Sequence, residues 1–556
     1  MILLFLKITL SKNCLSITTY TKIETPAKNF NEKKIFSVSY AKIISVDNLK
    51  NGLAKITNNV ALGLDGVTKA NCSEKKIEAL HKSLKSHRFS PTPVRKLSIS
   101  KLDDRNHPLG VVSQLDKIVQ AAILIQLEPI LEAVFLDCSY GYRPNKNCHH
   151  VLKVIKTKWQ HITWIIKIDI QKYFGTTNQN LLVKMLSLYL DQATIELIKK
   201  FLGCGYINIY NHLNPLGKTK IWASQDFLLS PILFNLYLHF LDKFIVDNLL
   251  SLWNRGDEQK YISGYHYRAR LTENEQKVAD CLNIKGLTEA IGRLKHNEWV
   301  KARLPSRDVK DENFRRMFYV RYVDDLLVGF CGTHAEAVRI KSTIEEFILN
   351  NLKLKTSEAK SYVTHSSARN IQFLGFYIRY VSNNKIIKGQ KKNEIYESEL
   401  GYPLKSIAIN SAQLRIPTEL ILRLAVVRGY GKARKAGSIR ASSCRRLSSL
   451  EDKLIVQRFS SIIKGLVNYY SPANRLSDLW AIVAFYRKSC ALTLADKHKF
   501  KTAAKVYKRY GPNLRVFDPA SKKETILFYP TTLKTNTNFK LGKNNITLLS
   551  SILDST

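Results

Sequence analysis

The hydrophobic and polar positions between residues 316 and 330 predict a β-hairpin. Two apolar runs rich in β-branched and aromatic residues lie on either side of the adjacent carboxylates Asp324 and Asp325. Such runs are typical of strands, and Asp is common in the tight turns that join them. The hairpin would present two acidic side chains at one end. An ordinary turn is the alternative interpretation of an isolated Asp-Asp pair.

A second strand with a carboxylate near its end is predicted at residues 164–170. Its sequence, Trp-Ile-Ile-Lys-Ile-Asp-Ile, is mostly apolar and places Asp169 at the end of a buried strand. Carboxylates from two strands can hold divalent ions, and two ions about 4 Å apart stabilise the attacking and leaving oxygens of phosphoryl transfer. The pattern therefore makes Asp169, Asp324 and Asp325 candidate metal ligands and catalytic residues.

Helical periodicity dominates much of the remaining chain. Apolar residues recur at a spacing near 3.6 in residues 117–136, which predicts a packed helix. Further helices are predicted at residues 334–352, 462–470 and 486–498, while residues 250–315 are polar, charged and irregularly helical. The mixture of strands and helices predicts an α+β fold.

The composition indicates several domains and a polyanionic partner. The chain has 556 residues, of which 45% are hydrophobic, enough for several packed cores. Lys and Arg number 87 against 45 Asp and Glu, which gives a formal net charge of +42. Nucleic acid is the usual partner of so basic a chain, with an anionic membrane surface as the alternative. No isolated basic amphipathic helix favours the membrane surface, and no apolar run is long enough to span a bilayer.

The cysteine pattern and the N-terminal sequence indicate the cellular compartment of the protein. The nine cysteines form no C-x-x-C pair, which argues against a zinc ribbon, a zinc-bound nuclease module and a secreted disulfide framework. The apolar N-terminus contains Lys, Ser and Thr, no Arg, and no acidic residue before Glu24. This fits a mitochondrial targeting peptide, or equally an extension encoded in the organelle. We expect a mitochondrial location, with the chloroplast as the alternative.

Several segments, in order along the chain, resemble the group II intron-encoded proteins, which combine a reverse transcriptase with a maturase. The resemblance rests on Ser-Tyr-Gly-Tyr-Arg-Pro at residues 139–144, Tyr-Val-Asp-Asp at 322–325 and Gln-Phe-Leu-Gly-Phe at 372–376. The last of these is similar to the family's short strand that grips the primer. The resemblance implies right-hand polymerase fingers and palm, followed by an all-helical, thumb-like maturase domain called domain X.

The resemblance also implies the domain boundaries. We expect, in order, an N-terminal extension or targeting segment, the fingers, the palm with a charged insertion, domain X and a tail. Their residues are 1–50, 51–160, 161–385 with the insertion at 250–315, 401–515 and 516–556. Mobile family members often continue into a DNA-binding region and a zinc-bearing nuclease. We expect a member that lacks this C-terminal endonuclease.

The resemblance assigns nucleotide-binding roles in the fingers and palm. A Lys and an Arg of the family's fingers hairpin contact the incoming triphosphate, because fixed cations pair with phosphates. Lys101 matches the Lys, whereas His107 stands at the Arg position and is mostly neutral at pH 7. Lys360 resembles the family's palm lysine near the nucleotide. Phe174, five residues after Asp169, resembles the steric gate that excludes a ribose 2′-OH, with a core position as the equal alternative.

One turn departs strongly from the family's pattern. The family reads Gly-Thr-Pro-Gln-Gly-Gly-Pro-Leu-Ser-Pro where residues 222–231 read Trp-Ala-Ser-Gln-Asp-Phe-Leu-Leu-Ser-Pro. Gln225 is retained as a nucleotide-binding candidate, but Asp226 and Phe227 replace glycines. Gly is used where the backbone approaches a ligand closely, and Asp226 adds negative charge near a triphosphate. Together with His107, these replacements predict impaired nucleotide binding.

A basic stretch between Leu420 and Leu450 predicts an RNA-binding surface. It holds eight basic residues and no acidic residue, interleaved with Tyr430, although a solvated face is the alternative interpretation. The resemblance places this stretch in domain X and adds template contacts after the Ser-Tyr-Gly-Tyr motif. The RNA-binding candidates are Arg143, Lys146, Arg423, Arg428, Lys432, Arg434, Lys435, Arg440, Arg445, Arg446, Lys488 and Lys497.

Three functions compete. A maturase would bind group II intron RNA, largely electrostatically, and stabilise the fold from which the RNA splices itself. An active RNA-directed DNA polymerase would use the three carboxylates to bind Mg²⁺ and would take a DNA primer or target as a further partner. A remnant with neither activity is the third, which the motifs retained along the chain oppose. The basic stretch and domain X favour a maturase on a reverse-transcriptase scaffold.

Overall fold

We describe the fold from a computed structural model of the chain, in which helices and strands are mixed, in agreement with the predicted α+β class. The structure describes residues 38–56, 63–100, 106–171, 176–207, 216–217, 227–257, 260, 311–368, 370–381, 390–391, 394–395, 411–434, 437–518, 523–536 and 539. Most of the expected N-terminal extension and charged insertion therefore lie outside the described residues.

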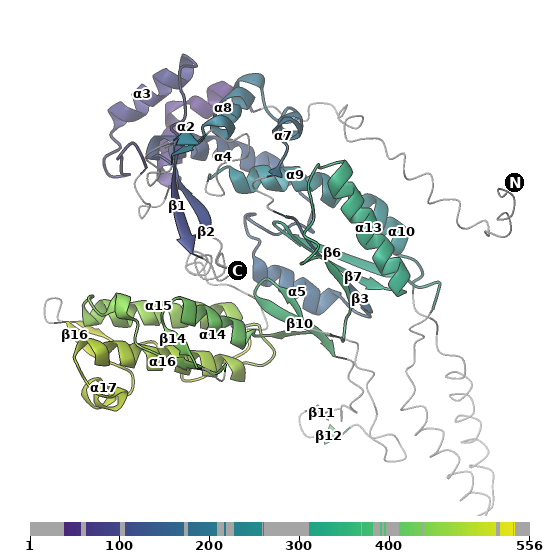
Figure 1. The fold of residues 1–556 in the computed structure, drawn as a ribbon. Coiled ribbons are helices and arrows are strands. Elements are labelled where there is room, and N and C mark those ends of the chain that lie inside the picture. The colour runs from purple at the N-terminus through teal and green to yellow at the C-terminus, as the bar shows by residue number, and fades with distance from the viewer. Residues whose placement is uncertain are drawn as a thin grey trace, which may run out of the picture.

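Helices form the N-terminal end of the molecule (Figure 1). They are α1 (Tyr40–Ile44), α2 (Val46–Lys55), α3 (Glu74–Lys85) and α4 (Gln114–Val134). α1 and α2 pack on α4, and α3 packs on α1 and α2. α4 begins where the Ser113 hydroxyl accepts a hydrogen bond from the Asp116 backbone N–H, and it is buried over most of its length. The helix predicted at residues 117–136 is thereby confirmed.

A four-stranded sheet with the order β2-β1-β4-β5 stands beside these helices. Its strands are β1 (Val94–Ser100), β2 (Asn106–Val111), β4 (Tyr206–Ile207) and β5 (Leu216–Gly217). β1 and β2 form an antiparallel hairpin in which His107 pairs with Ile99. The hairpin implied by the family resemblance is therefore present. Lys101 belongs to the connection between the two strands, outside the described residues.

A second four-stranded sheet, here called the central sheet, has the order β6-β7-β3-β8. Its strands are β3 (Trp164–Asp169), β6 (Arg316–Tyr322), β7 (Asp325–Cys331) and β8 (Tyr362–His365), and all neighbours are antiparallel. One face packs against α9 (Ser230–Phe244) and α13 (His334–Asn350). The other packs against α5 (Cys148–Lys158) and C-terminal elements. Burial on both faces explains why β3 and β7 read as apolar runs.

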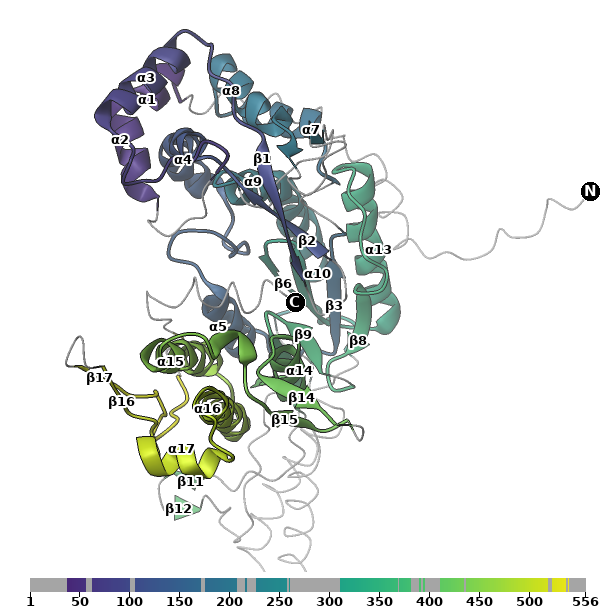
Figure 2. The same cartoon turned by 60° about the vertical axis from the view of Figure 1, so that its left-hand side comes forward.

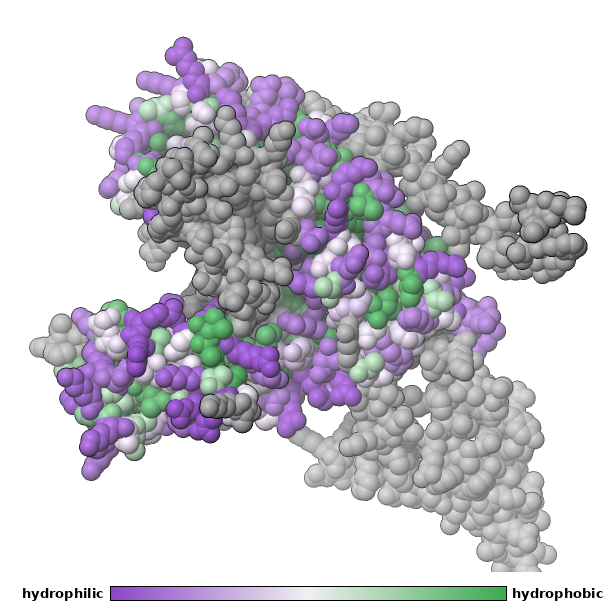
Figure 3. Space-filling view, viewed as in Figure 1, coloured by the Kyte–Doolittle hydropathy of each residue, from purple (hydrophilic) through white to green (hydrophobic). Residues whose placement is uncertain are grey.

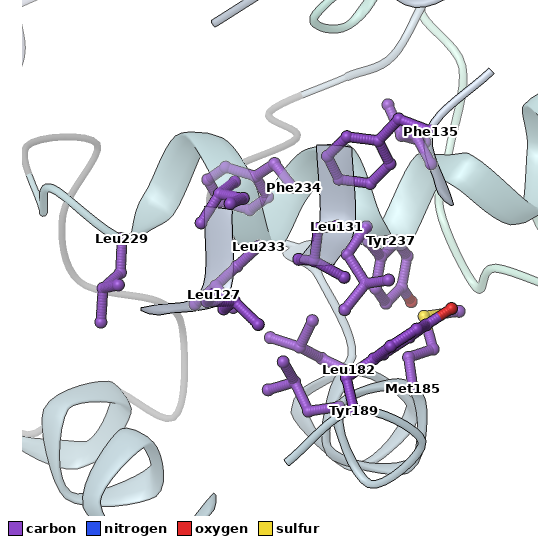
Figure 4. Close-up of a cluster of buried hydrophobic side chains, with 14 of the residues drawn as sticks. Leu127, Leu131, Phe135, Leu182, Met185, Tyr189, Leu229, Leu233, Phe234 and Tyr237 are labelled. Atoms are coloured by element: carbon purple, nitrogen blue, oxygen red, sulfur yellow. The ribbon is translucent and has the colours of Figure 1, made fainter. Parts of the chain in front are cut away.

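Helices α4, α9 and α7 (Gln179–Leu186) contribute side chains to one buried hydrophobic cluster. Leu131 of α4, Leu182 of α7 and Tyr237 of α9 converge there (Figure 4). The Tyr237 hydroxyl donates to the backbone carbonyl of Leu352 at 2.6 Å. Further elements of this region are α8 (Gln192–Gly203), the π-helix η3 (Ile245–Leu250) and α10 (Ser251–Trp253). This packing fixes α9 against the central sheet.

The C-terminal lobe, residues 411–536, consists mainly of helices (Figure 2). Its helices are α14 (Thr418–Val427), the 3-10 helix η4 (Arg445–Leu447), α15 (Asp452–Tyr470), α16 (Ser477–Lys497) and α17 (Ala503–Tyr510). A sheet of order β13-β10-β9 joins it to the central sheet region. These strands are β9 (Ile371–Phe373), β10 (Phe376–Val381) and β13 (Ser411–Arg415), and a separate short pair is β11 (Gln390–Lys391) with β12 (Glu394–Ile395).

The prediction that this lobe is all-helical was wrong. A small hairpin, β14 (Gly431–Ala433) with β15 (Ile439–Ala441), interrupts the domain predicted at residues 401–515. A second hairpin, β16 (Val516–Asp518) with β17 (Lys523–Thr525), lies in the segment predicted as the tail. The physical reason at the first hairpin is glycine. Gly437 has φ +76, which suits a turn, and a Cβ on Gly431 would lie 2.6 Å from the Phe485 ring. Within the described residues, no helix is long and apolar enough to cross a membrane.

Candidate metal centre and nucleic-acid interface

Asp324 and Asp325 lie at the end of the β6–β7 hairpin. Tyr322 pairs with Asp325, so Val323 and Asp324 form a two-residue turn. Val323 has φ +58, a left-handed conformation that costs an L-residue about 1–2 kcal/mol. Of the two turn residues, only the first has a positive φ. This pattern is typical of a type II′ turn, in which Gly usually occupies the first position. The surrounding structure must therefore impose this conformation on the β-branched Val323.

β3 brings the third carboxylate to the same end of the central sheet. Asp169 is the register partner of Asp325, and such partners have Cα atoms about 4.5–5.5 Å apart. The Asp169 backbone N–H donates to the Ser361 hydroxyl at 3.1 Å, and its carbonyl accepts from the Ser357 N–H at 2.8 Å. The three predicted carboxylates therefore come together, although they are distant in sequence.

Two lysines lie close to the three carboxylates and partly neutralise their negative charge. The Lys167 ammonium lies 3.4 Å from Oδ1 of Asp325, and that of Lys360 lies 3.7 Å from Oδ2 of Asp169. Burial, with a smaller contribution from the Asp169 charge, raises the pKa of Asp324 to about 6. Burial, partly offset by Lys167, raises the pKa of Asp325 to about 7. Bringing the carboxylates together is therefore electrostatically unfavourable without a further cation.

The donor set suits a hard divalent cation, because such ions take carboxylate oxygens. Oδ1 of Asp325 is buried and has the Lys167 ammonium 3.4 Å away, so an ion bound to this oxygen would have to replace the lysine as its partner. Across the described ranges, however, no three His, Cys, Asp or Glu side chains already stand in an arrangement that could hold one ion. The residues fit a divalent ion by chemistry and register, and binding requires their side chains to turn from the lysines.

A buried ion pair between β6 and α9 stabilises the hairpin turn. Arg321 of β6 and Asp242 of α9 have side chains 0% and 1% exposed, with Nη2 and Oδ2 2.6 Å apart. Nε of Arg321 donates to the same carboxylate at 2.8 Å, and Nη1 donates to the Val323 carbonyl at 3.0 Å. The Tyr319 hydroxyl also donates to Asp242, at 2.7 Å. Arg321 thus links helix α9 directly to the strained turn.

The loop at residues 139–144 completes this network. The Ser139 hydroxyl accepts from Nη2 of Arg321 at 2.7 Å. Asn235 of α9 accepts from Nη1 of Arg321 at 3.1 Å and donates to the Gly141 carbonyl at 2.7 Å. A Cβ on Gly141 would lie 2.5 Å from Cγ2 of Val323, so the loop and the turn touch. Sequence analysis missed Arg321 and Asp242, because residues 79 apart give no pairing signal.

The nucleotide-binding candidates are only partly placed. Lys360 lies beside Asp169, as stated above, and the position of His107 is known for its backbone alone. Lys101, Phe174, Gln225 and Asp226 lie outside the described residues. Phe227 is buried with Val94 and Val112, and its ring centroid is 6.3 Å from that of Phe201. The side chain that replaces a family glycine there is turned into the core.

Most RNA-binding candidates of the C-terminal lobe are solvent-exposed. They lie on α14, the β14–β15 hairpin, η4 and α16, and hydrophilic side chains cover much of this lobe in Figure 3. The exposed candidates are Arg423, Lys432, Arg434, Arg440, Arg445, Arg446 and Lys488. Arg428 is half-buried, and its carbonyl accepts from the Arg446 guanidinium. Lys435 lies outside the described residues.

Three other candidates are engaged within the protein. The Arg143 side chain is 4% exposed, donates three hydrogen bonds of 3.1, 2.9 and 2.7 Å to the Glu132 carboxylate, and donates to nearby carbonyls. Lys497 pairs with Asp452 at 2.6 Å, and Lys146 pairs with Asp137 at 3.0 Å. Burial and internal pairing give Arg143 a structural role, and its contact with RNA stays a prediction.

Two family models match the chain. The model "Reverse transcriptase (RNA-dependent DNA polymerase)" matches residues 99–265, and "Type II intron maturase" matches residues 410–550. The first includes Asp169, and the second includes the C-terminal lobe with its exposed basic residues. Two separate segments of the chain thus match two different domain families.

Curated relatives match across both domains. The group II intron-encoded protein LtrA of Lactococcus lactis subsp. cremoris is 30% identical over 492 residues, which are 86% of this chain and 78% of that protein. The uncharacterized 91 kDa protein in the cob intron of Schizosaccharomyces pombe is 30% identical over 87% of this chain and 56% of its own length. The putative COX1/OXI3 intron 1 protein of Saccharomyces cerevisiae is 28% identical, over 80% of this chain and 50% of its own length. The chain belongs to the family of group II intron-encoded proteins, with a reverse transcriptase domain and a type II intron maturase domain.

Proposed function

We propose that this protein is a maturase that binds group II intron RNA and promotes its splicing. The observation that carries the proposal is the set of exposed cationic side chains on the maturase domain, within a stretch that contains no acidic residue. Cations of this kind bind phosphates through counterion release, without needing a catalytic carboxylate. The Arabidopsis thaliana relative named nuclear intron maturase 1, mitochondrial, is 22% identical over 70% of this chain, which supports the proposal.

We further propose how the elements correspond to a right-hand polymerase. The β1–β2 hairpin belongs to the fingers at residues 51–160, and the central sheet is the palm at 161–385. The C-terminal lobe is the thumb-like maturase domain at 401–515. Two observations support this assignment: the order of the elements along the chain, and the position of the carboxylates at one end of the central sheet.

RNA-directed DNA synthesis is a second candidate function, favoured by the three carboxylates that meet at the central sheet. In this function Asp169, Asp324 and Asp325 bind Mg²⁺, and Lys360 lies near the nucleotide. His107 and Asp226 oppose it for the electrostatic reasons given above. Primer extension on an RNA template with Mg²⁺, using the native chain beside Asp226→Gly, tests it. DNA synthesis by the Asp226→Gly variant, without synthesis by the native chain, would show that the altered turn blocks polymerisation.

The test of the maturase proposal is a splicing assay with group II intron RNA from the same organism. The native protein should increase the spliced fraction at low Mg²⁺, where the RNA alone splices poorly. The triple variant Lys432→Gln, Arg434→Gln, Arg440→Gln should bind this RNA at least 10-fold more weakly, because it neutralises fewer phosphates and releases fewer counterions. Lys341→Gln, on α13, is the control. Unchanged splicing by the triple variant would contradict the assigned surface.

We also propose an organellar, mitochondrial location, with the chloroplast as the alternative. The relative from Marchantia polymorpha, named uncharacterized mitochondrial protein ymf11, is 25% identical over 78% of this chain and supports it. Fractionation of cells with an antibody against the C-terminal lobe is the test. Recovery of the protein outside both organelles would overturn the proposal.

A further inference from the structure

A second basic stretch lies near the end of the C-terminal lobe, apart from the stretch assigned to RNA above. No acidic residue occurs between Asp496 and Asp518. The ion pairs formed among the described residues of this lobe involve other side chains than the exposed cations of this stretch. We call these exposed cations the α17 surface; they are Lys499, Lys501, Lys505, Lys508, Arg509 and Arg515.

Helix α17 presents an apolar face to α16 and a cationic face to solvent. Val506 is fully buried, and the Arg487 guanidinium of α16 lies 5.3 Å from the centroid of the Tyr507 ring. Lys501 precedes the helix and Lys505 lies in its first turn, which holds no acidic residue. The helix dipole disfavours cations at this end. The stability of the helix therefore does not explain these lysines, whereas a polyanionic partner does.

An exposed aromatic ring lies next to these cations along the chain. Phe517 of β16 is 59% exposed and Ile526, directly after β17, is 44% exposed, whereas Val516 between them in the hairpin is buried. Side chains two residues apart in extended chain share a face, so Arg515 lies on the face of Phe517. The described acidic side chain on this face is Glu524, the register partner of Phe517. Cations beside an exposed ring are typical of single-strand binding, because bases stack on the ring while phosphates pair with the cations.

The α17 surface and the β14–β15 hairpin lie on different sides of helix α16 (Figure 2). The Ser489 hydroxyl donates to the Ser442 carbonyl, next to β15, at 2.7 Å. The Arg487 guanidinium donates to the Pro512 carbonyl, just after α17, at 2.6 Å. Residues two apart in a helix point about 200° apart around its axis. The two basic surfaces therefore face different directions and reach different segments of an RNA.

We propose that the α17 surface and Phe517 form a second RNA-binding site, which takes a single-stranded segment and stacks one of its bases on the Phe517 ring. The β14–β15 hairpin binds another segment, so that the lobe bridges two parts of one RNA. Linking two contacts in this way raises the effective concentration of each for the other. This inference rests on the proposed binding of intron RNA and adds to it the kind of RNA and the place where it binds.

The test of stacking uses the full chain and oligouridylate, which forms no duplex. Phe517→Ala should bind it at least about 5-fold more weakly, because base stacking on the ring is lost. Phe517→Leu should show the same loss, since it keeps apolar bulk without a ring, whereas Phe517→Trp should bind like the native chain. A blunt RNA duplex should bind Phe517→Ala and the native chain equally, because its bases are already stacked. Leu349→Ala, at a position 51% exposed on α13, is the control.

The test of charge uses Lys501→Gln, Lys505→Gln and Lys508→Gln in one chain. If each lysine pairs with a phosphate, the slope of log Kd against log salt for oligouridylate should fall by about 2, at about 0.7 for each phosphate of a single strand. The control Leu349→Ala should leave the slope unchanged. A slope equal to that of the native chain in the triple variant would overturn the assignment of the α17 surface to RNA.

The outcomes separate this site from the maturase function. Equal oligouridylate affinity of Phe517→Ala and the native chain would overturn the proposal, as would a native chain without affinity for oligouridylate. An equal loss of duplex and single-strand binding in Phe517→Ala would also overturn it, because stacking would then not be the cause. Splicing is measured in parallel. A native chain that binds oligouridylate through Phe517 but does not promote splicing would reject the maturase function alone.

Discussion

At the scale of single residues, the contact between Gly141 and Val323 controls where the carboxylates stand. The turn adopts an unfavourable backbone conformation, and the loop at residues 139–144 presses directly on it. A glycine at this point has a clear steric reason, because any Cβ would meet the backbone and side chain of Val323. Packing against Val323 thus explains the glycine of this motif.

Gly141→Ala should displace the turn. The new Cβ would lie 2.5 Å from Cγ2 of Val323 and 2.7 Å from its backbone nitrogen, so the backbone itself must move. We expect a loss of about 1–3 kcal/mol in the free energy of unfolding in urea, together with weaker Mn²⁺ binding measured by electron paramagnetic resonance. Gly203→Ala is the control, because its Cβ meets nothing within 4 Å. Native-like Mn²⁺ binding in Gly141→Ala would contradict the steric argument.

His149 should make stability depend on pH. Its folded-state pKa is about 4, below its usual value of 6.5, so the unfolded state takes up a proton first as pH falls. The protein should lose about 2 kcal/mol of unfolding free energy between pH 7 and pH 5 through this group. His149→Gln should flatten the dependence, whereas His150→Gln, on the partly exposed neighbour, should not. Chemical denaturation at both pH values measures this, and parallel curves for His149→Gln and the native chain would refute it.

At the scale of elements, three segments far apart in the sequence form one structural unit. They are the loop at residues 139–144, helix α9 and the β6–β7 hairpin, joined through Arg321 and Asp242. The residues of the network therefore maintain the fold of the hairpin whether or not the protein synthesises DNA. The presence of these motifs is for that reason weak evidence for polymerase activity, and the carboxylates must be tested by themselves.

Removing the charge of Asp242 should strongly lower the free energy of unfolding. Asp242→Asn leaves the Arg321 guanidinium buried without its counter-charge, which typically costs about 3–5 kcal/mol. Asp137→Asn is the matched control, since Asp137 is fully exposed in its pair with Lys146 and should change little. Thermal unfolding of both variants in the same buffer measures the difference. A similar small effect for both would show that the buried pair does not support the fold.

The basic surface should produce a steep salt dependence of RNA binding. If Lys432, Arg434 and Arg440 each contact a phosphate, their replacement by Gln should reduce the slope of log Kd against log salt by about 2 to 3. Filter binding of intron RNA over a range of KCl concentrations measures the slope. An unchanged slope in the triple variant would place the RNA contacts elsewhere on the molecule.

At the scale of the whole molecule, the maturase domain and the central sheet share one buried core. Ile165 and Leu327 of the sheet, Ile155 of α5 and Phe459 of α15 belong to the same hydrophobic cluster. The two matched domains are therefore not independent bodies joined by a linker. A protein whose polymerase chemistry has weakened would still need the sheet, since the maturase lobe packs against it.

Although the core is shared, RNA binding and carboxylate chemistry should be separable by mutation, because they are assigned to different parts of the surface. Asp324→Ala should leave intron splicing intact, because the surface that we assign to RNA lies on the other lobe. The same variant should abolish any DNA synthesis in primer extension, since it removes a carboxylate proposed to bind metal. Circular dichroism should confirm folding. Loss of splicing in a folded Asp324→Ala protein would disprove the separation.

Local structure and family membership could be recognised from the order of the amino acids. Periodicity predicted the helices α4 and α13, apolar runs predicted the strands β6 and β7, and the ordered motifs indicated the family. The basic stretch was visible as composition alone. These features are local or additive, so they can be recognised without knowing which segments touch.

The pairing of distant residues became visible only in the folded molecule. Folding joined Arg321 to Asp242, turned Arg143 inward to Glu132 and brought Tyr469 to the Leu374 carbonyl. It also placed Phe227 in the core and inserted the β14–β15 hairpin into a lobe predicted to be all-helical. Such pairings depend on which faces pack together after folding. The sequence does not show whether a charged or aromatic side chain will contact solvent, RNA or another part of the protein.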